Sequence, residues 1–274
     1  MSHFAAITKA VADARAANPL VGSWTNFVTI NLVANTQLAV GGRAAMCFMP
    51  DEAIPLTSIS KATYINIGTL EPVALEALPQ AAEAAVHLQK PWVFDPVAAG
   101  LGDTRNAIIK ALKKSKPSVI RGNASEIIAV SHLWELQSAN KGNVDGVDAT
   151  DSVEDALFSA RELAKWTGGV VAVSGETDVV LDARQTFRIS GGSAMLKTIT
   201  GAGCSLGGVI AVYAGVTDPL TAALTGSLAY KWASEEAESS STGSGSFQVA
   251  FIDRLSLLSG DALIAYARGV LKAN

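Results

Sequence analysis

The sequence has few of the residues that stabilise a protein through covalent cross-links or bound metals. Only two cysteines, Cys47 and Cys204, and three histidines, His3, His87 and His132, occur in 274 residues. They lie far apart along the chain, which excludes a disulfide framework and metal motifs of closely spaced ligands. Hydrophobic residues, in contrast, make up 49% of the chain. That fraction is enough to bury a large core, and the length fits one large α/β domain.

The sequence also lacks a basic excess and any long apolar run. The formal net charge of −4 argues against a nucleic acid as the main partner. No run reaches the roughly 18 uninterrupted apolar residues that a membrane span needs. Residues 1–19 show helical spacing of apolar positions and lack the basic start and apolar block of a signal peptide. We therefore expect a cytoplasmic protein without a membrane partner, with residues 1–274 forming a single domain.

Short apolar runs recur along the chain, and each leads through Gly, Asn or Asp into a helical pattern. This arrangement predicts an α/β fold with a mainly parallel central sheet flanked by helices. The predicted strands cover residues 64–67, 92–94, 118–120 and 170–173, and the predicted helices cover 72–88, 103–116, 124–134, 152–165, 205–214, 220–238 and 252–271. Three pieces at 179–181, 186–189 and 194–197 predict an antiparallel edge. Parallel sheets bind ligands at the carboxyl ends of their strands, so the residues after each strand are candidates for a site.

The segment 198–204, Thr-Ile-Thr-Gly-Ala-Gly-Cys, is the most informative part of the chain. Gly201, Ala202 and Gly203 allow the backbone to approach a ligand closely. The first amides of the helix that follows have no partner within the helix, which suits an anion such as a phosphate. Cys204 falls in the first helical turn, where we expect the helix dipole to lower the pKa of the thiol. A glycine-rich turn into a buried helix, with Cys204 as a small core residue, is the alternative.

Charged and hydroxyl side chains follow three of the predicted strands. We expect Asp95 to project beyond its strand and to bind Mg²⁺ or a water on that ion, although a turn aspartate is the alternative. Arg121 carries a guanidinium that matches phosphate oxygens, or it forms a surface ion pair. Glu126 stands three residues after Asn123, so that a helix capping box explains it equally well. Ser174 begins a polar turn whose hydroxyl contacts a nucleotide phosphate or caps the turn.

The segment 25–46 contains more amide side chains than an apolar helix face needs. Asn26, Asn31 and Asn35 recur at spacings of five and four. Buried amides require specific partners. These residues either line a pocket for a polar heteroaromatic ligand or satisfy backbone groups at loop junctions. Met46 would supply an adaptable apolar wall beside such a pocket, or act as an ordinary core methionine.

Seven segments in this order carry a resemblance to a known family. They are residues 25–35, 65–69, 95–100, 121–126, 174–178, 200–204 and 243–247. Together they resemble the hydroxyethylthiazole kinases of thiamine salvage, which belong to the ribokinase-like superfamily. The resemblance implies a ribokinase-like fold and a kinase that transfers the γ-phosphate of ATP to the hydroxyl of 4-methyl-5-(2-hydroxyethyl)thiazole with Mg²⁺.

The resemblance also implies roles for individual residues. Residues at the ligands fall into three groups: Asn26, Met46, Gly68 and Gly201 at the thiazole, Arg121 and Ser174 at ATP, and Asp95 and Glu126 orienting Mg²⁺ and its waters. The catalytic segment is then Gly201, Ala202, Gly203 and Cys204, whose amides receive the transferred phosphoryl group. Most ribokinase-like kinases have an aspartate base at the position of Cys204. The family is known as a homotrimer with active sites between subunits, which places the wall from Asn26 to Met46 and the nucleotide loop on different chains.

The chain departs from the family pattern near the expected thiazole wall. Ala44 and Ala45 replace the usual Ser-Pro, residues 47–53 differ from the family's more polar continuation, and Ser174 stands where threonine is usual. These changes bear on substrate choice more than on reaction type. The alternatives are another ribokinase-like alcohol kinase, acting on a hydroxymethylpyrimidine or pyridoxal, and a catalytically silent sensor of thiazole or nucleotide.

Overall fold

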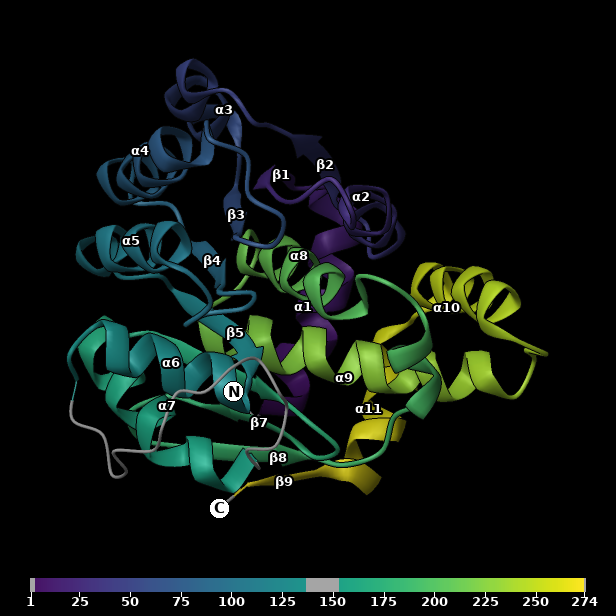
Figure 1. Ribbon diagram of the computed structural model, residues 1–274. Coiled ribbons are helices and arrows are strands. Elements are labelled where there is room, and N and C mark those ends of the chain that lie inside the picture. The colour runs from purple at the N-terminus through teal and green to yellow at the C-terminus, as the bar shows by residue number, and fades with distance from the viewer. Residues whose placement is uncertain (1–2, 137–152, 274) are drawn as a thin grey trace.

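The computed structural model describes residues 3–136 and 153–273 (Figure 1). Its strands form one nine-stranded sheet in the order β2-β1-β3-β4-β5-β6-β7-β8-β9. The first six strands of this order pair in parallel, and the pairs from β6–β7 to β8–β9 are antiparallel. The strands are β1 Leu20–Trp24, β2 Arg43–Met46, β3 Ala62–Asn66, β4 Trp92–Asp95, β5 Val119–Asn123, β6 Val170–Ser174, β7 Asp178–Leu181, β8 Thr186–Ile189 and β9 Leu271–Ala273.

Helices cover both faces of this sheet (Figure 1). One face carries α3 Ala53–Ile59, α4 Ala74–His87, α5 Asp103–Leu112, α6 Ala124–Leu133 and α7 Val153–Thr167. The other face carries α1 His3–Ala17, α2 Ile30–Ala39, α8 Ala202–Ala214, α9 Pro219–Glu238, α10 Ser244–Leu257 and α11 Gly260–Val270. Short 3₁₀ helices are η1 Pro50–Glu52, η2 Lys113–Ser115 and η3 Ala194–Thr198. Within the described ranges, none of the helices combines the length and the apolar character that crossing a membrane requires.

The central strands alternate their apolar side chains between the two cores. In β4, Val93 packs with α8 and α9, whereas Phe94 packs on the opposite face with α4 to α7. In β5, Val119 and Ile120 divide in the same way. Because both faces of the sheet are buried, β4 and β5 each begin with consecutive apolar residues, as is usual for parallel strands. Polar side chains are therefore confined largely to the strand ends, where they are available for a site.

The predicted parallel strands, the antiparallel pieces at 179–181 and 186–189, and all but one of the predicted helices are confirmed in position to within a few residues. The prediction of a strand at 194–197 is wrong. This segment is η3, because the Ser193 hydroxyl accepts a hydrogen bond from the Met195 amide at 3.0 Å and closes a turn. The starts of the segments predicted at 1–19 and 152–165, Met1 and Ser152, lie outside the described residues.

The predicted helix at 252–271 is also wrong, because it is two helices. The chain turns at Leu258 and Ser259, and the Ser259 hydroxyl accepts from the Ala262 amide at 3.2 Å to begin α11. Strands β1, β2 and β9 and helices α2 and α3 are absent from the predicted set. Strand β1 contains Gly22 and Ser23, and β2 contains two alanines, so that neither has the β-branched composition typical of a strand.

Candidate active site

Asp95 lies at the centre of a polar network at the carboxyl ends of the strands. It is the last residue of β4 and is fully buried, which corrects the expectation that it projects beyond the strand. Its Oδ2 lies 2.9 Å from the Tyr64 hydroxyl and accepts from the Asn66 amide at 2.9 Å. Its Oδ1 has no hydrogen-bond partner and faces Nη1 of Arg121 at 3.6 Å. Burial raises the pKa of Asp95 to about 6, although Arg121 opposes the rise.

Arg121 links this carboxylate to two loops. It lies in β5, next to β4, and only 8% of it is exposed, so that the alternative of a surface ion pair is excluded. Its Nη2 donates to the Ser174 hydroxyl at 2.9 Å. A Cβ atom added at Gly203 would lie 2.9 Å from Nη1, so the guanidinium lies directly against the start of α8. Nε is buried without a hydrogen-bond partner.

The segment predicted to bind phosphate is a tight entry into α8. Gly201 has a φ of +89° and forms the N-cap, and the helix begins at Ala202, three residues before the predicted start. A Cβ at Gly201 would meet Cβ of Thr29 at 2.9 Å, so both the conformation and the space favour glycine. The Ser205 amide bonds the Gly201 carbonyl at 2.8 Å. The amides before Ser205 have no carbonyl partner one turn back within the helix and are available to an anion.

Cys204 is the third residue of α8 and is partly buried. Its Sγ lies 3.9 Å from Nδ2 of Asn26. Burial and the nearby charge of Asp95 raise the pKa of the thiol to about 11. The expectation of a lowered pKa for this thiol is therefore wrong, because desolvation, the largest cause, and the charge of Asp95 raise it. Cys204 carries its proton at neutral pH.

Asn26 and Gly68 meet between the ends of β1 and β3. Nδ2 of Asn26 donates to Oδ1 of Asn66 at 2.8 Å, and the same oxygen accepts from the Gly68 amide at 2.9 Å. A Cβ at Gly68 would lie 2.3 Å from Nδ2 of Asn26. Because Asn26 also lies next to Cys204, one chain brings the amide wall and the phosphate loop together. Asn26 and the phosphate loop thus meet within one chain, whereas the expected sharing of the active site between subunits stays a prediction.

The other amides of the segment lie elsewhere. Asn31 is exposed on α2, and Asn35 donates to the Asn31 carbonyl at 2.9 Å. Local bonding within the helix explains this pair, and only Asn26 of the three belongs to the network. Met46 ends β2 and packs, partly buried, against the core cluster that also contacts Cys204.

Glu126 forms the capping box that its spacing from Asn123 predicts. Its Oε2 accepts from the Asn123 amide at 2.8 Å, and Oδ1 of Asn123 accepts from the Glu126 amide at 2.9 Å. Its Oε1 accepts from the Ala98 amide at 3.1 Å and so holds the loop after β4. Across residues 3–136 and 153–273, no three His, Cys, Asp or Glu side chains gather in a way that could hold a metal.

The residues nevertheless fit a magnesium ion that is shared with a substrate. Mg²⁺ is usually bound through one or two carboxylates, several waters and substrate phosphates. Oδ1 of Asp95 is a buried carboxylate oxygen without a hydrogen-bond partner. Both oxygens of Glu126 already accept backbone hydrogen bonds, so this carboxylate suits a water on the ion more than direct ligation.

Three residues of the network lie outside the predicted site set. Tyr64 and Asn66 are two positions apart on β3 and point to the same face, where they bracket Asp95. Their alternation about Ile65 in a strand that is buried throughout is a signal that the sequence offers. Arg105 donates to the Val97 carbonyl at 2.9 Å and to the Gly68 carbonyl, which ties the loops after β3 and β4. Its position on α5 gives no such signal.

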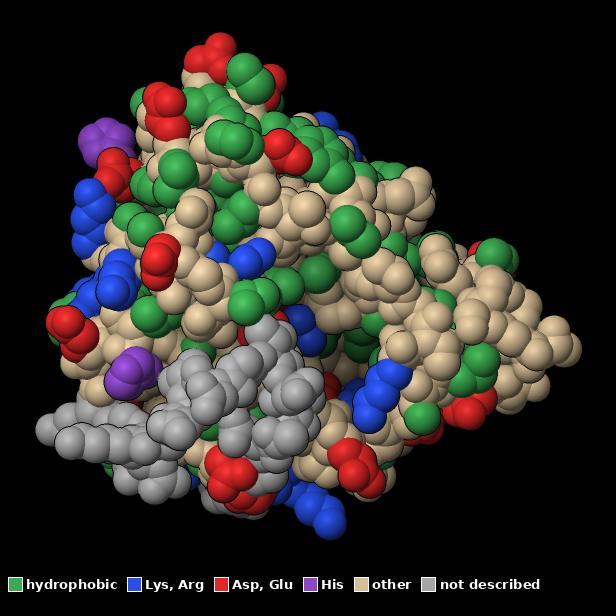
Figure 2. Space-filling view, viewed as in Figure 1, with side chains coloured by type: hydrophobic (Ala, Val, Ile, Leu, Met, Phe, Trp, Pro, Cys, Tyr) green, Lys and Arg blue, Asp and Glu red, His purple; other side chains and the backbone are tan. Residues whose placement is uncertain are grey.

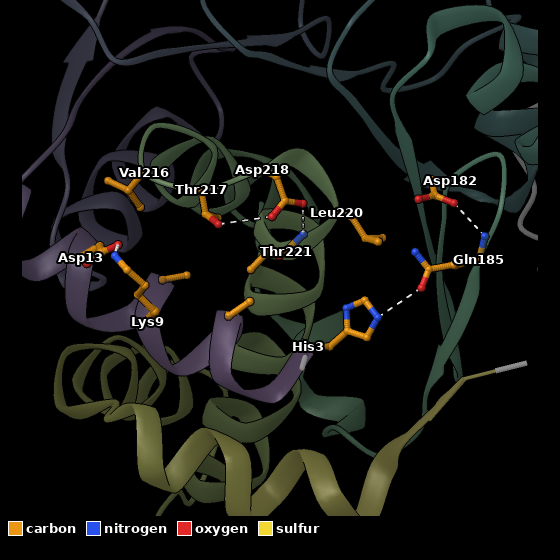
Figure 3. Close-up of a pocket in the computed structure, with 12 residues that line it drawn as sticks. His3, Lys9, Asp13, Asp182, Gln185, Val216, Thr217, Asp218, Leu220 and Thr221 are labelled. Atoms are coloured by element: carbon orange, nitrogen blue, oxygen red, sulfur yellow. Dashed lines mark hydrogen bonds and ion pairs between the residues drawn. The ribbon is translucent and has the colours of Figure 1, made fainter. Parts of the chain in front are cut away.

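The surface is hollowed beside the start of α8 in the space-filling view, which is viewed as in Figure 1 (Figure 2). A second cavity, of about 570 Å³, opens between α1, the β7–β8 turn and the α8–α9 connection (Figure 3). Its lining includes His3, Lys9, Asp182 and Asp218 and none of the predicted site residues. The candidate active site is therefore the network at the strand ends.

Comparisons with known proteins agree with this geometry. Residues 11–261 match the model of the hydroxyethylthiazole kinase family. A hydroxyethylthiazole kinase of Bifidobacterium longum subsp. infantis is 50% identical over 268 residues, covering 91% of this chain and 85% of the relative. The chain belongs to the hydroxyethylthiazole kinase family. The fold of this family member is also similar to solved structures.

The structure of the hydroxyethylthiazole kinase from Pyrococcus horikoshii superimposes with a TM-score of 0.85 and 29% identity, covering 98% of both chains. A ribokinase-like superfamily protein of Enterococcus faecalis superimposes with a TM-score of 0.56 over 88% of this chain and 87% of its own. At 13% identity, this second likeness concerns the fold alone. The family member thus has the ribokinase-like α/β fold that the sequence predicts, with a mainly parallel sheet and an antiparallel edge.

Proposed function

We propose that this chain transfers the γ-phosphoryl group of ATP to the hydroxyl of 4-methyl-5-(2-hydroxyethyl)thiazole. The observation that carries the proposal is the buried Asp95–Arg121 pair beside the first turn of α8. Oδ1 of Asp95 and Nε of Arg121 both have unused hydrogen-bonding capacity. Such buried groups call for a ligand, and the free amides and the guanidinium together suit a phosphate.

Phosphoryl transfer needs positioning and charge neutralisation more than covalent chemistry from the protein. In this proposal, Arg121 and the Ser174 hydroxyl bind the phosphates of ATP, and the amides at Gly201, Ala202 and Gly203 receive the transferred group. Asp95, together with Glu126 through a water, would hold Mg²⁺, which neutralises phosphate charge when bound.

The acceptor hydroxyl lies beside Cys204 in this mechanism. With a thiol pKa of about 11, Cys204 orients the alcohol as a neutral group and does not act as a thiolate base. An alcohol loses its proton late in a loose transition state, so a strong base is not needed. Asn26, Met46, Gly68 and Gly201 hold the thiazole ring.

We place the enzyme in the cytoplasm as a homotrimer. Association is supported by large apolar side chains that remain exposed around the edge strand β2. Phe27, Val28, Leu38 and Met49 are each more than half exposed. Sedimentation at micromolar concentration tests the trimer, and a fully active monomer contradicts it.

An assay with Mg·ATP against a panel of thiazole, pyrimidine and pyridine alcohols tests the function. We expect kcat/KM for the thiazole alcohol to exceed that for the others by at least about 100-fold, about 2.7 kcal/mol of discrimination. A preference for pyridoxal or a hydroxymethylpyrimidine contradicts the acceptor. Absence of ATP turnover with every alcohol contradicts the kinase assignment and favours a binding protein.

A further inference from the structure

Lys231 in α9 is a buried lysine whose ammonium group is fully used by one turn of the chain. Only 6% of Lys231 is exposed. Its Nζ donates to the Glu176 carbonyl at 2.8 Å and to the Gly175 carbonyl at 3.3 Å, and it lies 3.4 Å from Oδ1 of Asp178. Three donors thus meet three oxygens, so this ammonium leaves no donor for a ligand.

Asp178 completes the same turn from within. It is 7% exposed, and its Oδ1 also accepts from the Gly175 amide at 2.9 Å. The residues between Ser174 and Asp178 are therefore held by a carboxylate from inside the turn and by an ammonium from α9. Burying a lysine costs free energy of folding unless its charge is paired. The partners of Lys231 all lie in this turn, so the turn is where its role is to be sought.

The turn held by Lys231 begins at Ser174, which is the partner of Arg121. Ser174 is the last residue of β6, and its hydroxyl accepts from Nη2 of Arg121 at 2.9 Å. Displacement of the turn would move this hydroxyl and remove one of the bonds that fix the guanidinium. A shift of Lys231 would therefore move the turn that begins at Ser174 and, through the Ser174–Arg121 hydrogen bond, the guanidinium at the candidate nucleotide site.

The same part of α9 also holds the loop that leads to the start of α8. A Cβ at Gly192, whose φ is +88°, would lie 2.5 Å from Cδ of Lys231, so the lysine stem packs directly on the loop. The Ser193 amide donates to the Ser234 hydroxyl at 3.0 Å, and the Gly192 amide bonds a Glu235 oxygen. One turn of α9 therefore contacts both the turn that begins at Ser174 and the loop that leads to the phosphate segment.

We propose that Lys231 is a positioning residue for the nucleotide, which fixes the turn at Ser174–Asp178 relative to the loop before α8. This proposal rests on the assignment of ATP to Arg121 and Ser174. Lys231 itself touches neither the nucleotide nor the acceptor. Its loss should therefore weaken nucleotide binding and leave acceptor binding unchanged.

The experiment uses the full-length protein and measures the Kd of Mg·ADP by calorimetry, the KM of ATP, the KM of the thiazole alcohol and the melting temperature. The main variant is Lys231→Met/Asp178→Asn, which removes both charges and leaves no unpaired ion in the core. We expect the Kd of Mg·ADP and the KM of ATP to rise about tenfold, while the KM of the alcohol changes less than twofold. Thr225→Val serves as the control, because its buried hydroxyl bonds the Thr221 carbonyl within the same helix.

Equal changes in the two KM values, or a lower melting temperature with unchanged Kd for Mg·ADP, would overturn the proposal and leave Lys231 as part of the scaffold. If the double variant is too unstable to purify, Lys231→Gln replaces it, because the glutamine amide can still donate to the turn. We then expect the Kd of Mg·ADP to rise about threefold. An unchanged Kd would overturn the proposal. If the wild type binds Mg·ADP but does not phosphorylate the alcohol, the acceptor assignment fails while the positioning role is still measured. If the wild type does not bind Mg·ADP, both fail.

Discussion

Two buried ion pairs, both within residues 3–136 and 153–273, differ in how completely their atoms are bonded. In the Asp95–Arg121 pair, which is separated by 3.6 Å, Oδ1 and Nε have no hydrogen-bond partner. In the Asp178–Lys231 pair, which is separated by 3.4 Å, neither side chain has a buried polar atom without a hydrogen-bond partner. Spare capacity therefore distinguishes the pair at the candidate active site from the pair that holds a turn.

Local chain geometry explains the difference. Asp178 bonds the Gly175 amide of its own turn, so the chain supplies its partners within a few residues. Asp95 ends a central strand, and its partners come from the neighbouring strand β3 and, opposite, from β5. The strand ends bring these side chains together without bonding every atom, and this leaves Oδ1 of Asp95 without a hydrogen-bond partner.

The largest expected effect comes from replacing Asp95, and it tests whether unused hydrogen-bonding capacity marks the active ion pair. Asp95→Asn removes the charge that faces Arg121 and the oxygen available to Mg²⁺, so we expect kcat/KM to fall about 10³-fold or more, a loss of about 4 kcal/mol. Asp178→Asn removes the carboxylate of the other buried ion pair and should lower kcat/KM by less than about tenfold. Steady-state kinetics at saturating Mg²⁺ measures both. Equal losses in the two variants would mean that spare bonding capacity does not identify the active pair.

A second test concerns Cys204. Cys204→Ala keeps the amides of α8 and removes only the thiol, so we expect kcat to fall by about 10- to 100-fold with little change in melting temperature. Because the pKa of this thiol is raised to about 11, the wild-type rate should show no inflection from thiolate formation between pH 7 and 9. An inflection in that range that disappears in Cys204→Ala would identify the thiolate as the base.

A third test uses the pKa of Asp95. Burial raises this pKa to about 6, so the carboxylate is charged above pH 6 and protonated below it. We expect kcat/KM to fall about tenfold per pH unit on the acid side of pH 6. Arg121→Met removes the positive charge that opposes the rise, so its acid limb should move to higher pH. An acid limb that stays in place in Arg121→Met would assign the titration to another group.

The sequence predicts the parallel sheet and the strand-end residues well, because both follow from local patterns. Asp95, Arg121 and Ser174 each end or follow an apolar run, and they meet because neighbouring parallel strands end at one edge of the sheet. The Gly201–Cys204 segment was likewise predictable from its small residues next to an apolar helix. These signals can be read from short stretches of sequence, without knowing which distant segments pack against one another.

The features that sequence analysis missed depend on contacts between distant segments. The thiol pKa was predicted in the wrong direction because the burial of Cys204 and its closeness to Asp95 come from the packing of α8 on the sheet. Lys231 gives no signal, because its turn lies more than 50 residues earlier in the chain. Asn31 and Asn35 had a suitable composition, but the helical turn directs them to the outer surface of α2.

The smallest expected effect concerns Ser174, where the two buried pairs connect. Its hydroxyl accepts from Nη2 of Arg121, while the turn that it begins is held by Lys231. Ser174→Ala removes one hydrogen bond to a guanidinium that retains Asp95, so the KM of ATP should rise about fivefold, which corresponds to about 1 kcal/mol. Ser174→Thr keeps the hydroxyl and should stay within about twofold of the wild type. Steady-state titration of ATP at a fixed concentration of the alcohol measures both variants. An equal rise in Ser174→Ala and Ser174→Thr would show that the turn responds to side-chain volume, and that the hydroxyl does not link the Lys231 turn to Arg121.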